Sequence, residues 1–528
     1  MEKDSAMNKS IFNEWKFPTV IILMLAGLVV SKWLLSLSQM ILFILIITDK
    51  GGIRRQINAF KNPLVLILIS VFFLHAAGLL WSDDISYGFR DIRNKIQLLT
   101  FPAMIAAIPI QNKSKSVIIL KSFVLFMGLM SAINLVRYFT IHHSSDFQAA
   151  LWHSHIRFSI MLCFSMFSLL WLFVRKFIAK AELIPAILLM VISGVSLIFL
   201  ESFTGLVIFG LLLPFSALLH RKNIRNKSLK IISVVILLII SLGFIYTVYS
   251  VKSSFFPNTA PVKLNEVEKH TPSGNVYKHD TISTLNENGN LVYLYICREE
   301  IEQEWEKRSS MPLYKDSLWQ GNILIRYLSS RGFRKDSTGI WQLTEQDITN
   351  IENKIPNYRL ENIDPVRKRL YMFFWELNVY KNSNDPSGHS LTQRLEYWKA
   401  ARLIIEENFW TGVGTGDVKA AFAAAYQKMN SLLDDEFRLR AHNQYLTFWV
   451  TFGVFGLILF LFSILYPVFI VPQRHNILYI GFIFIFLLSM LNEDTLETQV
   501  GLSFYALFNS LFLFVLISKD FIHPTLKK

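Results

Sequence analysis

Cysteine is almost absent from the 528-residue sequence. Cys163 lies in an apolar run and Cys297 lies in a polar stretch. A disulfide framework or a zinc site needs several cysteines or histidines at short, regular spacing. The sequence therefore excludes a disulfide-stabilised domain and a zinc cluster.

Charged residues are also scarce. They make up 17% of the chain, against 52% hydrophobic residues, and the mean hydropathy is +0.38. A soluble domain carries about 25% charged residues, and a disordered chain is poor in apolar ones. This composition excludes an ordinary cytosolic enzyme and a disordered protein.

The formal net charge of +14 has an uneven distribution. Residues 250–441 contain 25 Lys and Arg and 25 Asp and Glu, so the whole excess lies among the apolar segments. A nucleic-acid-binding domain would concentrate its basic residues in a folded polar region. The distribution instead indicates membrane topology, and we expect no nucleic-acid partner.

Long apolar segments occupy both ends of the chain. A membrane-spanning helix needs roughly 20 apolar residues. Twelve segments approach this length: 17–31, 33–48, 63–81, 96–110, 116–139, 156–175, 183–200, 203–219, 229–249, 443–465, 476–492 and 500–518. The first two segments are short and adjacent. They could form a single span, so the alternative is a protein with eleven spans. The predicted fold is an all-α polytopic membrane protein.

The basic residues of the short loops predict its orientation. With the N-terminus inside, 21 Lys and Arg fall on the cytoplasmic side and 4 on the other. Cytoplasmic loops carry the excess of basic residues. We therefore expect both termini in the cytoplasm, nine spans in 1–249, one large extracytoplasmic (periplasmic) loop at 250–442, and three spans in 443–528.

The large loop has two parts. Residues 257–385 mix a β-like run at 290–297 with polar helices at 298–307 and 344–354, which predicts a small α/β insertion. Apolar residues at helical spacing from Leu391 to Phe409 predict an amphipathic helix at the membrane surface. A Gly-rich turn follows, and then a helix to Met429 with Asp417 as its N-cap.

His442 and Asn443 stand where the loop enters the span at 443–465. An imidazole at this interface reaches both a lipid-linked group and a water-borne one. Its titration near neutral pH suits proton abstraction from a hydroxyl. The alternative is that the pair only caps or anchors the helix.

Two further features of the loop bear on phosphate binding. Gly412, Gly414 and Gly416 precede a helix and could present N–H groups to a phosphate, but no strand or Lys-Ser/Thr accompanies them, so a tight turn between helices is favoured. Arg394 could bind a diphosphate bidentately. A solvated arginine on an amphipathic helix is the alternative.

Two more charged features lie outside the loop. Arg157, with His153 and His155, stands at the outer mouth of the span at 156–175. A cation at membrane depth is costly, so Arg157 is a functional candidate, although it could simply extend to the interface. The acidic turn from Asn492 to Glu497 could hold a catalytic Arg or His, but an outward-facing acidic loop is favoured.

Together these motifs resemble a known family. Arg394, the glycines of "GVGTG" and the run "HNQYL…FGVFGLILF" are similar to the signature region of the O-antigen ligase and polymerase family, best over about 390–465, with weaker likeness in helix number, loop placement and "NEDTLETQVG". The resemblance implies transfer of a glycan from undecaprenyl diphosphate to an acceptor hydroxyl at the periplasmic face of a bacterial inner membrane, without metal or cofactor.

The resemblance also assigns residue roles. It implies that His442 is catalytic, that Arg394 binds the diphosphate, and that Asn443 and the three glycines support the site. A second family arginine is missing, because Phe203 stands at its position in "ESFTG". We expect Arg157 to supply that charge.

The acceptor is open at this stage. Lipid A core, as in lipopolysaccharide biosynthesis, is the favoured acceptor, and a polysaccharide polymerase or a protein O-oligosaccharyltransferase is the alternative. A lipid or glycan transporter is a more distant one, because transporters place polar or broken helices at the bilayer midplane.

Overall fold

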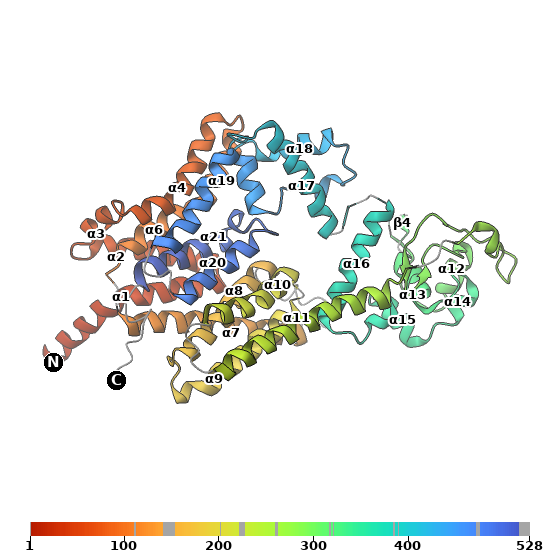
Figure 1. The fold of residues 1–528 in the computed structure, drawn as a ribbon, viewed down its shortest axis with the longest axis horizontal. Helices are drawn as coiled ribbons and strands as arrows, with labels where there is room; N and C mark the ends of the chain where they lie inside the picture. Colours follow the sequence, from red (N-terminus) through yellow and green to blue (C-terminus); the bar gives the residue numbers. More distant parts are fainter. Residues whose placement is uncertain are drawn as a thin grey trace. The chain divides into compact units, whose positions relative to one another are not determined.

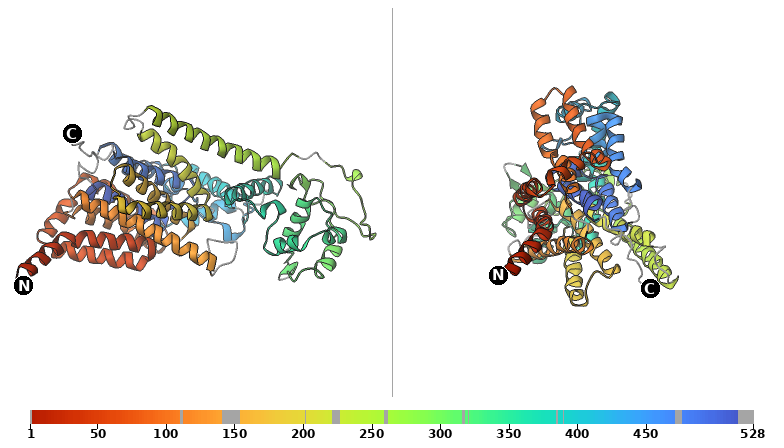
Figure 2. Two further views of the ribbon diagram at one scale, coloured as in Figure 1. Left: turned by 90° about the horizontal axis from the view of Figure 1, so that it is seen from below. Right: turned by 90° about the vertical axis from the view of Figure 1, so that its left-hand side faces the viewer.

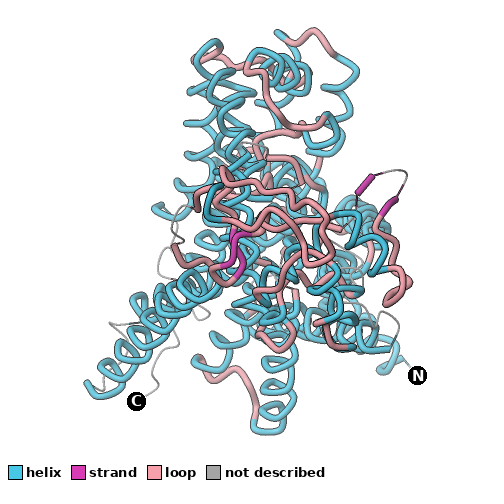
Figure 3. The backbone as a smooth tube through the Cα atoms, turned by 90° about the vertical axis from the view of Figure 1, so that its right-hand side faces the viewer, coloured by secondary structure: helices cyan, strands magenta, loops and turns pink. Residues whose placement is uncertain are grey.

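The computed structural model is mainly helical, with long loops and two short strand pairs (Figures 1 and 3). It describes residues 2–109, 112–140, 154–200, 202–220, 227–258, 262–315, 318–319, 321–383, 386–388, 390–470 and 476–516. The chain forms two units. The first comprises residues 1–234, 396–431 and 438–528, and the second comprises 235–395 and 432–437.

The first unit contains most of the predicted spans. Its helices are α1 (Glu2–Val30), α2 (Lys32–Thr48), α3 (Gly52–Ala59), α4 (Pro63–Ala77), α5 (Ile85–Lys95), α6 (Gln97–Ala106), α7 (Lys113–Thr140), α8 (His155–Val174), α9 (Leu183–Phe199), α10 (Phe203–His220), α18 (Val418–Lys428), α19 (Gln444–Ile470), α20 (Ile477–Ser489) and α21 (Gln499–Ser510). Helices α11 (Lys227–Phe255) and α17 (Ser390–Glu407) cross from one unit to the other.

An aromatic cluster holds the centre of the first unit together. Helix α8 packs against α7, α10 and α20, and α21 packs against α6. Phe164 of α8 contacts Phe123, Phe482, Phe504 and Phe508 at ring-centroid distances of 5.0–5.8 Å, mostly edge to face or tilted. Such interlocked rings supply the van der Waals packing that joins helices in lipid.

The predicted all-α membrane architecture is confirmed, whereas the number of spans stays a prediction. Among the described residues, six helices are long and apolar enough to cross a bilayer, or seven when the pair α2 and α3, bent by 112°, counts as one span. Helices α1 and α2 lie side by side (Figure 2). Helices α20 and α21 are apolar but shorter.

The segment predicted as a span at 96–110 is divided differently. Helix α5, which carries alternating polar and apolar residues, ends at Lys95, and the apolar α6 covers only ten residues from Gln97 to Ala106. The predicted start at 96 is therefore a boundary between two helices.

The second unit is a small helical domain. It contains α12 (Arg298–Trp305), α13 (Asn322–Arg331), α14 (Ser337–Trp341), α15 (Glu345–Glu352) and α16 (Pro365–Ser383), with two hairpins of two-residue strands: β1 (Asn286–Glu287) with β2 (Asn290–Leu291), and β3 (Tyr314–Lys315) with β4 (Leu318–Trp319). Helices α12 and α15 confirm the predicted polar helices. The predicted strand at 290–297 is wrong beyond Leu291, because the chain turns there. Tyr295 has a left-handed backbone (φ 58°), and Ile296 makes isolated bridges to Lys278 and Lys335.

The predicted periplasmic position of the loop that contains most of the second unit is open to a labelling test. A single cysteine at the exposed Ser310, in a variant without Cys163 and Cys297, is expected to react with an impermeant maleimide in intact spheroplasts. A cysteine at the exposed Ser114 should react only after the membrane is permeabilised. Protection of Ser310→Cys in intact spheroplasts would contradict the predicted orientation.

Candidate functional site

His442 lies just before α19 in the first unit, with a left-handed backbone (φ 47°) that a residue other than glycine rarely adopts. Its ring stacks on Tyr397 of α17, with centroids 5.6 Å apart and an angle of 27° between the planes. The side chain is 32% exposed, and its Nδ1 lies 3.7 Å from Glu493 Oε2. Nδ1 is buried without a hydrogen bond to any described residue, so the exposed part of the ring carries Nε2.

Asn443, not His442, caps helix α19. Its Oδ1 accepts hydrogen bonds from the N–H groups of Tyr445 and Leu446, and its Nδ2 donates to the carbonyl of Leu491. Capping of this kind satisfies N–H groups that the first helical turn leaves unbonded. The imidazole is therefore left for another role, while Asn443 fixes the backbone beside it.

Glu493 joins His442 to Arg157. Its side chain is 2% exposed, and its Oε2 lies 3.5 Å from Arg157 Nη2 as well as 3.7 Å from His442 Nδ1. Arg157 Nη1 donates to Ser154 Oγ at 3.0 Å, which holds the guanidinium at the start of α8. The structure thus brings Arg157 and His442 together, although 285 positions separate them in the sequence.

The expectation that the acidic turn faces outward is wrong. Glu493, Asp494 and the Glu497 side chain are all at least nine-tenths buried. Each has a partner, because Thr447 donates to Asp494 at 2.7 Å, and Glu497 Oε2 lies 2.7 Å from Lys95 Nζ. Buried carboxylates need such partners to offset their lost hydration.

Glu497 is the centre of a buried ion cluster next to the site. Arg440 Nη1 lies 3.1 Å from Oε2, and Gln444 Nε2 donates to Oε1 at 3.0 Å. Burial alone would raise the pKa of Glu497, but the charges of Lys95 and Arg440 outweigh it and hold that pKa below its usual range. Burial and the charge of Glu497 raise the pKa of neighbouring Asp494.

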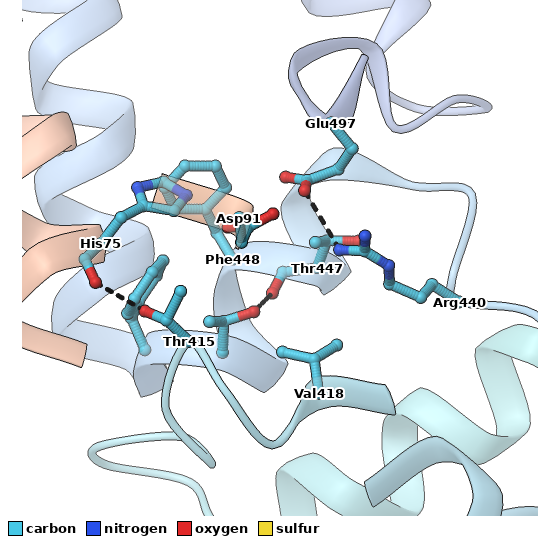
Figure 4. Close-up of a pocket in the computed structure, with 10 residues that line it drawn as sticks. His75, Asp91, Thr415, Val418, Arg440, Thr447, Phe448 and Glu497 are labelled. Carbon is cyan, nitrogen blue, oxygen red and sulfur yellow. Dashed lines mark hydrogen bonds and ion pairs between the residues drawn. The ribbon is translucent and has the colours of Figure 1, made fainter. Parts of the chain in front are cut away.

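A small cavity of about 10 Å³ opens beside this cluster (Figure 4). Arg440 reaches across to Glu497, and the other polar residues of the wall are His75, Asp91, Thr415, Thr447 and Thr451. A space of this size holds about one water molecule, not a sugar. The cavity is therefore too small to hold a glycan.

The glycine turn packs against a break in α19. Helix α19 departs from helical geometry at Gly453 (φ 65°, ψ −169°). The N–H groups of Val413 and Gly414 bond the carbonyls of Val450 and Thr451, each at 2.9 Å. The N–H of Gly416 bonds Ser82 Oγ. These donors are occupied, so the turn is a packing element and its glycines do not form a phosphate cradle.

Space explains the glycines of the turn. A Cβ at Gly412 would meet the Thr451 carbonyl at 2.4 Å, and one at Gly416 would meet the Asp84 carbonyl oxygen at 2.3 Å. Asp417 stands at the N-cap position of α18, as predicted. Its carboxylate, however, accepts from the N–H groups of Asp83 and Asp84 and makes no cap within its own helix.

Arg394 lies in the second unit, on the first turns of α17, where its Nη1 donates to the carbonyl and the Oγ of Ser390. His153 falls outside the described residues, and His155 begins α8. The segment "ESFTG" lies close to the acidic turn, because Asn492 Nδ2 donates to Thr204 Oγ1 at 3.0 Å. The position at which the family arginine is missing is therefore adjacent to the turn that binds Arg157.

Three residues of the site were not predicted from the sequence. Lys95, Arg440 and Tyr397 had no assigned role. Arg440 precedes His442 by two positions, which is the only sequence signal that could have singled it out. Among the described residues no group of three or more His, Cys, Asp and Glu could hold a metal. Metal independence stays a prediction.

Comparison with known proteins bears on residues 351–461, which match the family model described as O-Antigen ligase. The matched segment contains α17, the glycine turn, His442 and most of α19. No curated protein gives a match. The family match confirms, over this segment, the resemblance predicted from the motifs.

Proposed function

We propose that this protein belongs to the O-antigen ligase family and transfers a glycan from undecaprenyl diphosphate to a hydroxyl of the lipid A core, at the periplasmic face of a bacterial inner membrane. The observation that carries the proposal is the single carboxylate oxygen of Glu493 between His442 and Arg157. It places a proton acceptor beside a cation, which are the two groups that displacement of a diphosphate needs.

His442 acts as the general base. Its exposed Nε2 takes the proton of the acceptor hydroxyl as that oxygen attacks the anomeric carbon. The bond from the anomeric carbon to the diphosphate breaks, and the diphosphate leaves with the electron pair. A single displacement inverts the anomeric configuration. Glu493 orients the ring through Nδ1 and stabilises the imidazolium that forms, a division of roles seen wherever a carboxylate supports a catalytic histidine.

The arginines bind the leaving diphosphate. Arg157 is 16% exposed, so its guanidinium acts in a partly dehydrated site where charge interactions are strong. Arg394 precedes Tyr397 by three positions on α17, and helical spacing places both on one face of that helix. Tyr397 in turn stacks on His442. This spacing supports Arg394 as the second diphosphate ligand.

Deletion of the gene tests the function. The deleted strain is expected to make lipopolysaccharide without long glycan chains, while undecaprenyl-linked polymer accumulates. Wild type, but not His442→Gln, should restore the chains. Short chains that still reach lipid A would instead indicate a polymerase, and loss of protein glycans alone would indicate a protein O-oligosaccharyltransferase. Loss of the long chains with the lipid-linked glycan confined to the inner leaflet would indicate a transporter.

Replacement of Arg157 by Ala is expected to lower turnover ten- to hundredfold, since a charged hydrogen bond to phosphate contributes about 1.5–3 kcal/mol. Arg157→Lys should recover part of the loss. Initial rates at several donor concentrations measure the effect. Arg394→Ala is expected to behave alike.

Arg93→Ala is the matched control, because Arg93 is exposed on α5. It should leave turnover unchanged. Normal turnover in Arg157→Ala at normal expression would remove Arg157 from the site.

A further inference from the structure

A second, larger cavity lies at the other end of α8. It measures about 330 Å³, is open on one side, and is lined by residues of α7, α8, α9 and the turn before α9. Its walls are mainly apolar, with Leu125, Leu169, Leu172, Ile178, Ala186 and Leu189 among the lining residues. This volume lies within the range of small-molecule binding sites.

An ion pair fixes one side of this cavity. Lys121 Nζ of α7 lies 2.6 Å from Glu182, whose carboxylate also accepts from the N–H of Ala179. The pair joins α7 to the start of α9, and Lys121 neutralises the charge of Glu182. The two elements are thereby held at a set separation, with the apolar space between them.

Four basic residues lie near lining residues of the cavity, either along the chain or through contacts with their sequence neighbours. Lys176 and Lys180 flank the lining residue Ile178 and are exposed. Lys113 lies over the ring of Phe177, and Arg175 lies over that of Trp171. None of these four cations forms an ion pair within the described part of the chain. The two acids nearby, Glu14 and Glu182, are paired with Lys115 and Lys121.

We propose that this cavity binds an anionic phospholipid of the surrounding bilayer. One acyl chain lies between α7 and α9, and the phosphate lies among Lys113, Arg175, Lys176 and Lys180. Basic pockets between spanning helices bind acidic headgroups in this way. The predicted orientation puts these four cations in the cytoplasmic leaflet, where anionic lipids supply the opposite charge.

The site is separate from the proposed diphosphate site. Fifteen positions of α8 separate Arg157 from Leu172, which corresponds to about 22 Å along the helix. The proposal therefore goes beyond glycan transfer and does not depend on it.

Titration of the full-length protein in dodecyl maltoside, followed by native mass spectrometry, tests the proposal. The probes are dioleoyl phosphatidylglycerol and dioleoyl phosphatidylcholine. The wild type is expected to retain one phosphatidylglycerol more tightly than phosphatidylcholine. The variant Lys113→Gln/Lys176→Gln/Lys180→Gln should bind phosphatidylglycerol about a hundredfold more weakly, at about fivefold for each cation lost.

Two controls separate charge from space. Lys50→Gln/Arg54→Gln/Lys61→Gln removes three cations from the α3 region and should keep wild-type affinity. Ala186→Phe fills the cavity without changing charge and should abolish the tight site, whereas Ala181→Phe, at an exposed position, should not.

Three results would overturn the proposal. They are equal binding of phosphatidylcholine, an equal loss in the α3 variant, and displacement of phosphatidylglycerol by equimolar undecaprenyl diphosphate. The last result would assign the cavity to the glycan donor.

Discussion

Replacement of His442 by Gln is expected to slow glycan transfer by about 10²–10⁴, the usual contribution of a positioned general base. Gln keeps a polar side chain of similar reach and still allows the contact with Tyr397, so it removes only proton transfer. Single-turnover rates with purified protein and lipid-linked donor measure the loss. Donor affinity should stay near the wild-type value, because His442 does not contact the diphosphate in this mechanism.

His270→Gln is the matched control, since His270 is exposed in the second unit. It should transfer glycan at the wild-type rate. A purified His442→Gln variant with near-normal rate would refute the general-base role while leaving the fold and the family unchanged.

Replacement of Glu493 tests whether His442 acts alone or with the support of this carboxylate. Glu493→Gln keeps the shape of the side chain but no longer balances an imidazolium 3.7 Å away. If the carboxylate supports the base, this variant lowers the maximal rate with little change in the KM for the donor, and the double variant with His442→Gln is no slower than His442→Gln alone. Additive losses would show that Glu493 acts through Arg157 only.

The sequence predicted the helical segments well because hydropathy and length act locally. The predicted segments at 116–139 and 156–175, for example, agree with α7 and α8 within three residues at each end. The amphipathic helix from 391 and the helix after Asp417 were also predicted, since apolar spacing and the glycines set their limits.

The partners within the site could not be predicted in this way. Glu493 meets Arg157 across 336 positions, and Glu497 meets Lys95 across 402. No local pattern encodes which acid pairs with which base. The prediction that the acidic turn is exposed was consequently wrong. Its sequence resembles that of a solvent-exposed loop, and the buried partners of its acids are far away in the chain.

Lys95 shows how much the site depends on such a pairing. It is 1% exposed, and its Nζ donates to the Leu496 carbonyl at 2.9 Å and lies 2.7 Å from Glu497. Lys95→Met keeps the length and apolar stem of the side chain but leaves the buried Glu497 with Arg440 as its remaining cation. We expect a loss of stability of about 3–5 kcal/mol, the usual result of removing one partner from a buried ion pair. The apparent thermal midpoint in detergent, at one scan rate, measures it.

Lys115→Met is the matched control, because its partner Glu14 is 64% exposed at 3.4 Å, and exposed pairs contribute at most about 1 kcal/mol. Lys95→Met/Glu497→Gln should be more stable than Lys95→Met, since no uncompensated carboxylate stays buried. A midpoint for Lys95→Met equal to that of Lys115→Met would show that the ion cluster does not hold the acidic turn. Because that turn carries Glu493, Lys95→Met should also lower the rate of transfer through His442 at temperatures where the protein is still folded.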